Sequence, residues 1–166
     1  MHVSGVLQHP LYSWIQAMQF YTNEGLVQIG AFRYLPSENN LVKPNQIRNS
    51  AQGYIFLDKN VDEYFKTALL EESNLIGITP SAASNTITGE IVDFFIDDLG
   101  FSADWTLEVK YIVSRDITGQ CYNKIYKIHK NKTAKFTNFV GVLNDIMKRN
   151  IEKIFLDKDL LNCIAS

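Results

Sequence analysis

The sequence predicts an α+β protein in which a mainly antiparallel sheet carries two amphipathic helices packed on one face. Two long segments repeat apolar residues at helical spacing, and three consecutive segments after residue 85 alternate apolar and polar residues as strands do. Short polar turns join those three segments, which is typical of an antiparallel meander. With one earlier strand, the expected order along the chain is β-α-β-β-β-α.

The first strand is expected in "GLVQIGAFRYL", residues 25–35, and Pro36 ends it. Its apolar side chains fall on two sides: Val27, Ile29 and Ala31 on one, Phe32 and Tyr34 on the other. The next stretch, "PSENNLVKPNQIRNSAQG", is rich in Asn, Ser and Pro, so residues 36–53 are interpreted as a long exposed loop. A short extended piece, "GYIFLD", follows it.

The two helices are predicted from an apolar stripe and, for the first, from its ends. That helix is expected to begin after Asn60, a good N-cap, and to end at Gly77. Its stripe consists of Val61, Tyr64, Phe65, Ala68, Leu69, Leu75 and Ile76. The second helix covers about five turns, and its stripe consists of Phe136, Phe139, Val140, Leu143, Ile146, Met147, Ile151, Ile154 and Phe155. Both stripes are interpreted as core.

The three strands of the meander are expected in residues 86–97, 104–114 and 121–130. The middle one alternates most cleanly, and its predicted inner face carries Trp105, Leu107, Val109, Tyr111 and Val113. The bulkier side of the last strand carries Tyr122, Tyr126 and Ile128. Residues 25–158 are expected to form one α+β domain, with an N-terminal extension at 1–24 and a C-terminal tail at 159–166.

Composition excludes several classes of protein. Hydrophobic residues make up 46% of the 166 residues and charged residues 20%, which is typical of a folded domain and too apolar for a disordered chain. The 16 basic and 18 acidic side chains give a net charge of -2, so there is no overall basic surface for nucleic acid. No apolar run approaches the ~18 residues of a membrane span.

Three aspartates, Asp97, Asp98 and Asp104, lie between two apolar runs in "FFIDDLGFSADWTLEV". A calcium loop of the EF-hand type needs alternating oxygen ligands, a central Gly and a Glu at position twelve, and this spacing does not provide them. A catalytic carboxylate pair needs a pocket that perturbs a pKa, whereas hairpin tips are usually solvated. We therefore interpret the three aspartates as part of a turn, with Gly100 supplying the unusual backbone angles.

A strip of lysines begins in the last predicted strand and continues beyond it, and it has two interpretations. Its members are Lys124, Lys127, Lys130, Lys132 and Lys135, and His129 lies among them. With Tyr122 and Tyr126 between them, the lysines could bind a nucleic-acid backbone and stack bases. Alternatively, they face Glu90, Asp93 and Glu108 on neighbouring strands and protect a strand edge. The acidic net charge favours the second interpretation, so we do not expect nucleic acid as a partner.

Other candidate sites are weak. His2 and His9 lack a third metal ligand, and neither a nucleophile motif such as G-x-S-x-G nor a glycine-rich phosphate loop occurs. Cys121 and Cys163 could both be free, or they could pair in an oxidising compartment. We therefore expect no enzyme activity, no cofactor and no metal.

The pattern of elements resembles YajG-like bacterial envelope lipoproteins over residues 25–158. The segments that carry the resemblance are "VQIGAF", "GYIFLDKNVDEYFKTALLEE", "ITGEIVDFFIDDLGFSADWTLEVKYIV" and "KTAKFTNFVGVLNDIMKRNIEKIF". It implies a small lipid-anchored outer-membrane protein that faces the periplasm, has no known enzyme activity, and serves as an accessory subunit of a secretion system or transporter. The signal peptide and lipid-bearing cysteine that it implies are not in this sequence. If they have been removed, the periplasm is expected, and otherwise the cytoplasm.

From these observations we expect a non-enzymatic envelope component that binds other envelope proteins, with a membrane contact through a lipid anchor absent from this chain. The alternative is a cytoplasmic nucleic-acid-binding module that uses the Lys124–Lys135 strip. Long polar loops are common partner sites. The expected partner-binding side chains are therefore those of the long loop: Lys43, Asn45, Gln46, Arg48 and Asn49.

Overall fold

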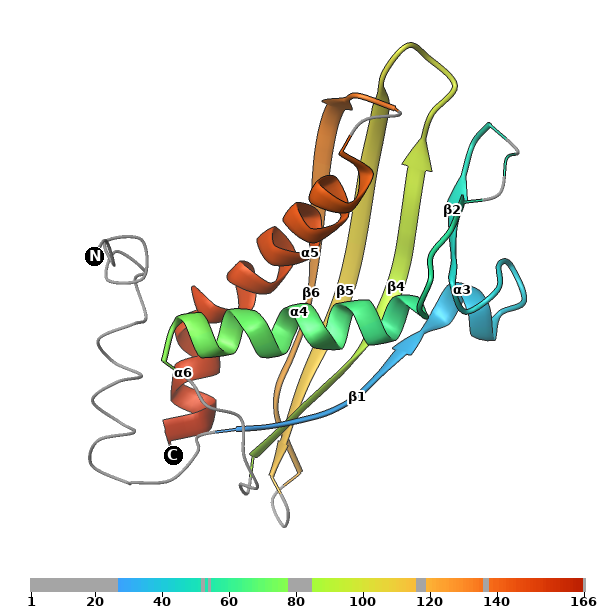
Figure 1. The fold of residues 1–166 in the computed structure, drawn as a ribbon. Coiled ribbons are helices and arrows are strands. Elements are labelled where there is room, and N and C mark those ends of the chain that lie inside the picture. The colour runs from blue at the N-terminus through green and yellow to red at the C-terminus, as the bar shows by residue number, and fades with distance from the viewer. Residues whose placement is uncertain are drawn as a thin grey trace, which may run out of the picture.

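The computed structural model describes residues 27–51, 53, 55–77, 85–115, 119–135 and 138–165. The elements are β1 (Gln28–Tyr34), α3 (Leu35–Glu38), β2 (Gln46–Asn49), β3 (Ile55–Phe56), α4 (Val61–Leu75), β4 (Asn85–Asp97), β5 (Ala103–Arg115), β6 (Gly119–Thr133), α5 (Phe139–Phe155) and α6 (Lys158–Ala165). Helices α4 and α5 lie on the same face of the sheet (Figure 1). The predicted α+β class is confirmed.

The sheet is mainly antiparallel and has β4 near its centre. Its strand order is β3-β2-β4-β5-β6, with β1 also paired to β4. The long β4–β5–β6 meander is antiparallel, as expected, whereas β1 and β2 each run parallel to β4. Both parallel strands use the same edge of β4, because β5 occupies the other edge.

A bulge in β1 brings both of its apolar sides into the core. The pairing with β4 shifts between Ile29 and Phe32, so Ile29, Phe32 and Tyr34 are all buried whereas Ala31 is exposed. Phe32 lies opposite Gly89, where an added Cβ would approach the Phe32 ring to 2.6 Å. Simple alternation therefore placed Ala31 wrongly, because the sequence pattern does not reveal a bulge.

The core lies between the sheet and the two long helices. The five alternating residues predicted on the inner face of β5 are all buried. From the helices, Phe65 and Leu69 of α4 and Leu143 and Ile146 of α5 are at most 1% exposed. Most of the two predicted stripes therefore packs on the sheet, but Leu75 in α4 and Val140 in α5 were predicted wrongly, because they are 49% and 59% exposed. Phe136 lies outside the described residues.

The helix boundaries follow local signals. Helix α4 has Asn60 at its N-cap and Gly77 just beyond its end, with φ of 90°, a conformation that glycine adopts at little cost. Helix α5 starts after Asn138, which is left-handed with φ of 55°. Within the described part of the chain, no helix combines the length and apolar character needed to cross a membrane.

The predicted long loop is wrong for much of residues 36–53. Helix α3 occupies residues 35–38, and β2 joins the main sheet with Ile47 fully buried. In the irregular parts, an asparagine side chain supplies a hydrogen bond that a neighbouring strand would otherwise make. Asn45 Nδ2 donates to the Leu57 carbonyl at 3.0 Å. β2 and β3 pair antiparallel. We refer to residues 46–56 as the β2–β3 arm.

The predicted C-terminal tail is also wrong, because residues 158–165 form helix α6. Leu160, Cys163 and Ile164 are buried, and Cys163 forms a disulfide with Cys121 at the start of β6. The Arg115 guanidinium donates to the Cys163 carbonyl. The sequence left the state of the two cysteines open, and the structure pairs them.

Candidate partner-binding groove

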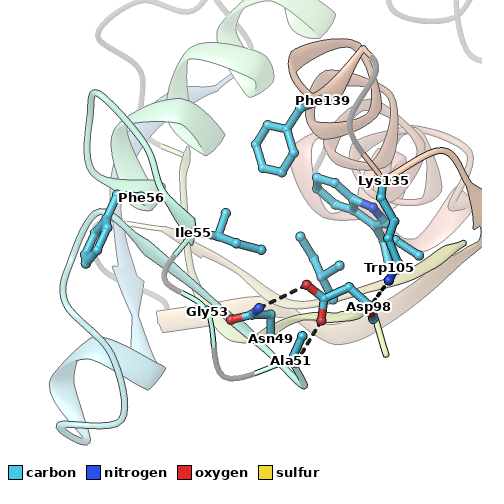
Figure 2. A pocket seen from close by; sticks show the side chains of 11 residues that line it. Asn49, Ala51, Gly53, Ile55, Phe56, Asp98, Trp105, Lys135 and Phe139 are labelled. Carbon is cyan, nitrogen blue, oxygen red and sulfur yellow. Dashed lines mark hydrogen bonds between the residues drawn. The ribbon is translucent and has the colours of Figure 1, made fainter. Parts of the chain in front are cut away.

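An open groove of about 510 Å³ lies at the end of the sheet where α5 begins (Figure 2). Three parts of the chain form it: the β2–β3 arm, the β4–β5 connection, and the segment that leads into α5. The residues that shape it most are Asn49, Ile55, Asp98, Trp105, Lys135 and Phe139. The volume falls in the range of pockets that hold a small ligand or a few side chains of a partner.

The floor of the groove is apolar and rigid. Trp105 on β5 is 3% exposed, and its ring lies 5.0 Å from that of Phe139 and 5.9 Å from that of Phe94. Figure 2 shows Ile55 of the β2–β3 arm across the groove from Phe139 and Trp105. Because aromatic pairs at these distances reinforce each other, the floor is a preformed apolar surface.

The polar rim is organised by Asp98. Its carboxylate accepts hydrogen bonds from Asn49 Nδ2 at 3.0 Å, Ser50 Oγ at 3.3 Å and Ala51 N at 2.9 Å. Partial burial acts to raise the pKa of the Asp98 carboxyl, but these hydrogen bonds outweigh it and hold the pKa below its ordinary value. The Lys135 ammonium donates a hydrogen bond to the backbone carbonyl oxygen of Asp98. The rim therefore ties the arm to the end of β4.

The β4–β5 connection, residues 98–102, carries two bare apolar side chains. Leu99 is 73% exposed and Phe101 is fully exposed. We call residues 98–102 the tip; it projects beyond the helices in Figure 1. Val140, at the start of α5, adds a third exposed apolar side chain at this end. These three exposed side chains lie at the same end of the sheet as the groove, although none of them lines it.

The three aspartates are divided between strand ends and the tip. Asp97 and Asp104 are register partners at the ends of β4 and β5, and only Asp98 lies in the connection. The turn interpretation is therefore confirmed for Asp98, which in addition anchors the β2–β3 arm. Gly100 has no positive φ, so the expected unusual backbone angles at this position are wrong.

The five residues expected to bind a partner do not form one surface in the structure. Asn49 lines the groove, and the Lys43 ammonium lies 5.7 Å from the centre of the Phe56 ring, which also lines it. The others make internal contacts. Asn45 holds the Leu57 carbonyl, Gln46 Oε1 accepts from the Lys43 backbone at 3.1 Å, and Arg48 pairs with Asp93 at 3.0 Å. Their role toward a partner stays a prediction.

The lysine strip is split between the two faces of β6. Lys124 and Lys130 lie on the helix side, where they pair with Asp157 and Asp159 and with Asp145 respectively. These acids belong to the helical layer, so the expected pairing of these two lysines with acids on neighbouring strands is wrong. Lys127 stands opposite Glu108 in the strand register, as expected. A single basic surface is therefore not formed by Lys124, Lys127 and Lys130.

The other predicted groups lie away from the groove. His129 is exposed on β6, with Nδ1 3.0 Å from Thr106 Oγ1. At the α5–α6 junction, Asp157 Oδ2 accepts hydrogen bonds from two tyrosine hydroxyls and Lys124. Burial acts to raise the Asp157 pKa, but these donors outweigh it and lower the pKa. His2 and His9 lie outside the described residues.

Sequence reasoning missed the groove itself. Trp105 and Phe139 were assigned to the core, and nothing in their spacing shows that an opening lies above them. One signal was present: Leu99 and Phe101 occupy a turn, where polar residues and glycine usually predominate.

Comparisons with solved structures place the fold among known ones. The chain is similar to protein XCC0632 of Xanthomonas campestris, of the family DUF330, with a TM-score of 0.56, 5% identity, and coverage of 84% of each chain. It is also similar to an uncharacterized protein, with a TM-score of 0.58, 13% identity, and coverage of 78% of this chain and 89% of that one. The chain has the fold of these two proteins. At such identities the likeness shows the fold alone.

Other comparisons are weaker. A minor lipoprotein from Acinetobacter baumannii is similar at a TM-score of 0.43, with 8% identity over 70% of this chain and 91% of that one. Alanine–tRNA ligase of Borreliella afzelii (strain PKo) is 33% identical over 79 residues, which are 48% of this chain and 13% of that protein. The chain thus spans a small part of that relative's length. No protein-family model matches the chain.

Proposed function

We propose that this chain is a non-catalytic component of the bacterial envelope that binds a partner protein through the groove and the tip. The observation that carries the proposal is the open apolar floor of Trp105 and Phe139 beside the exposed Leu99 and Phe101. Leu99 and Phe101 offer most of the apolar area that a partner could cover, since Trp105 is only 3% exposed, and such area contributes more to association than scattered surface charges do. The partner is proposed to be another protein of the envelope.

The envelope location has independent support from the disulfide. Cys121 and Cys163 are paired, and disulfides persist mainly in oxidising compartments such as the periplasm. The resemblance to YajG-like lipoproteins leads to the same compartment. On this proposal the protein is an accessory subunit of an assembly such as a secretion system or a transporter. It faces the periplasm from the outer membrane, held by a lipid.

The proposal is tested by capturing partners from a native envelope extract with matched variants. Phe101→Ser removes the larger of the two exposed apolar side chains of the tip, and Ala51→Trp fills the groove from its exposed rim without altering the core. Ile125→Ser is the control, because Ile125 is 53% exposed on β6 and does not line the groove. Single substitutions are preferable to replacing residues 41–53, since β2 belongs to the sheet.

The expected result is that one set of partners is lost with Phe101→Ser and with Ala51→Trp, and is kept with Ile125→Ser. Circular dichroism checks that all variants are folded. Equal recovery with all four proteins would remove the groove and the tip from the interface. Trapping the thiols with an alkylating reagent in intact cells tests the compartment, because a cytoplasmic chain would be recovered with Cys121 and Cys163 reduced.

A further inference from the structure

The disulfide between Cys121 and Cys163 is accessible from one side only. Cys121 on β6 is exposed, whereas Cys163 on α6 is 5% exposed. Both cysteines line an open pocket of about 450 Å³, which we call the disulfide pocket. Arg115 at the end of β5 also lines it, and Ala103 at the start of the same strand lines the groove. The disulfide pocket and the groove therefore lie at opposite ends of β5.

The difference in exposure determines which sulfur a reductant can reach. Thiol–disulfide exchange begins when a thiolate attacks one sulfur of the bond, and its rate depends on access to that sulfur. An incoming thiolate is therefore directed to Cys121, with Cys163 as the leaving group. Exposed disulfides are in general the labile ones, whereas most structural disulfides of secreted proteins resist reduction.

The bond holds α6 to the sheet. This helix is eight residues long, and helices of that length are not stable without tertiary contacts. Leu160 and Ile164 are buried, and Asn85 Nδ2 donates to the Ile164 carbonyl at 3.3 Å. Asp159 pairs with Lys124 at 2.6 Å, but its side chain is 64% exposed, so this ion pair contributes little. The covalent bond is therefore a major part of what keeps α6 in place.

The junction in front of α6 is held independently of the disulfide. Asp157 Oδ2 accepts hydrogen bonds from the hydroxyls of Tyr122 at 2.7 Å and Tyr126 at 2.6 Å and from the Lys124 ammonium at 2.8 Å. All three donors belong to β6. Breaking the S–S bond therefore leaves Asp157 attached to the sheet and frees the segment that follows it, residues 158–165.

We propose that the Cys121–Cys163 bond is a redox-labile site at which a dithiol reductant acts on the folded protein and releases α6. One thiolate of the reductant attacks Cys121 Sγ, the S–S bond breaks, and Cys163 leaves as a thiolate that takes a proton from water. The second thiol of the reductant loses its proton and attacks its own sulfur in the mixed disulfide, so that Cys121 leaves and is protonated. The protein gains two electrons and two protons, and the reductant becomes a disulfide. This site is separate from the groove and does not depend on the proposed function.

The first test measures how the bond is reached. The purified protein is reduced with dithiothreitol at several urea concentrations below its unfolding transition, and free thiols are trapped with N-ethylmaleimide and counted by mass spectrometry. The rate is expected to change by less than about twofold, because the folded state reacts; a route through global unfolding would accelerate with the unfolded population. A rate that follows the unfolded population would overturn the proposal.

The direction of attack is read with a monothiol. Glutathione stops the exchange at the mixed disulfide, and tryptic cleavage after Arg115, Lys124 and Lys158 places the two cysteines in different peptides. Glutathione is expected on Cys121. Recovery mainly on Cys163, or equally on both, would contradict the assigned direction of attack.

The second test measures the release of α6 by hydrogen exchange. In the reduced protein, the amides of residues 158–165 are expected to exchange faster than those of α5 by about tenfold or more, with rates that do not depend on urea below the transition. Cys121→Ser cannot form the bond and should show the same local opening without reductant. Equal urea dependence of α5 and α6 in reduced wild type, or its global unfolding in circular dichroism, would show that α6 is not released separately and would overturn the proposal.

Discussion

Replacing Asn150 tests how strongly one buried polar network holds the helical layer to the sheet. Asn150 on α5 is fully buried, and its Oδ1 accepts from the Tyr111 hydroxyl at 2.7 Å. Its Nδ2 donates to the carbonyls of Leu107 at 3.1 Å and Tyr126 at 2.9 Å. One side chain therefore bonds to both β5 and β6. No sequence pattern predicted it, because an asparagine in a helix is usually exposed.

The expected loss of unfolding free energy depends on which buried polar groups lose their hydrogen-bond partners. Tyr111→Phe leaves Asn150 Oδ1 buried without its donor, which costs about 1–3 kcal/mol of unfolding free energy. Asn150→Leu strands the Tyr111 hydroxyl and removes a donor from two carbonyls, so about 3 kcal/mol is expected. The double variant replaces both partners by apolar groups. Its loss should therefore fall below the sum of the two single losses by about 1–2 kcal/mol.

Urea unfolding of the four proteins, followed by far-UV circular dichroism, measures these values through the midpoint and the slope. The comparison requires similar slopes in all four, since a changed slope would indicate altered compactness. Additivity within about 0.5 kcal/mol would refute the coupling between the two side chains. A stabilised Asn150→Leu variant would show that the network costs more than it contributes.

Replacing both Cys121 and Cys163 by Ala is expected to lower the unfolding free energy by about 4 kcal/mol, from the loop-closure relation and a sequence separation of 42. The same loss in wild type after adding a reductant would support it, and no change under either treatment would contradict it. Leu143→Ala should cost about 2–5 kcal/mol because it leaves a cavity in the core, and an unchanged thermal melt would show that the layer assignment is wrong. The lowered pKa of Asp157 implies stabilisation that is present above about pH 4, the unfolded-state value, and lost as the pH falls through the folded value. Asp157→Asn should therefore flatten the decline of stability below about pH 4; a decline as steep as in wild type would count against this.

The regular elements were predictable because their signals are local. Asn60 and Gly77 bracket α4 as expected, and the alternation along β5 places every predicted inner residue in the core. These features depend on neighbours a few residues away. A short stretch of sequence is therefore enough to predict them.

The features that prediction missed depend on distant partners. Residues 36–53, which include β2, resembled a loop because they are rich in Asn, Ser and Pro. However, Asn49 at the end of β2 and the following Ser50 bond to carboxylates almost fifty residues away. Helix α6 is eight residues long, and its place depends on a disulfide that spacing alone could not assign. The groove exists only once the arm, the tip and α5 come together, so no window of the sequence contains it.

Two strands share one edge of β4, and of these two only β2, with the rest of the β2–β3 arm, contributes residues to the groove. Along that edge β1 registers with five residues of β4, whereas β2 registers with two, Phe95 and Ile96. The β2–β3 arm therefore has fewer backbone pairs to β4 than β1 has, and we expect its amide hydrogens to exchange faster than those of β1. A partner segment bound in the groove would contact the arm and stabilise its pairing with β4. Binding should therefore slow hydrogen exchange of the backbone amides in the arm.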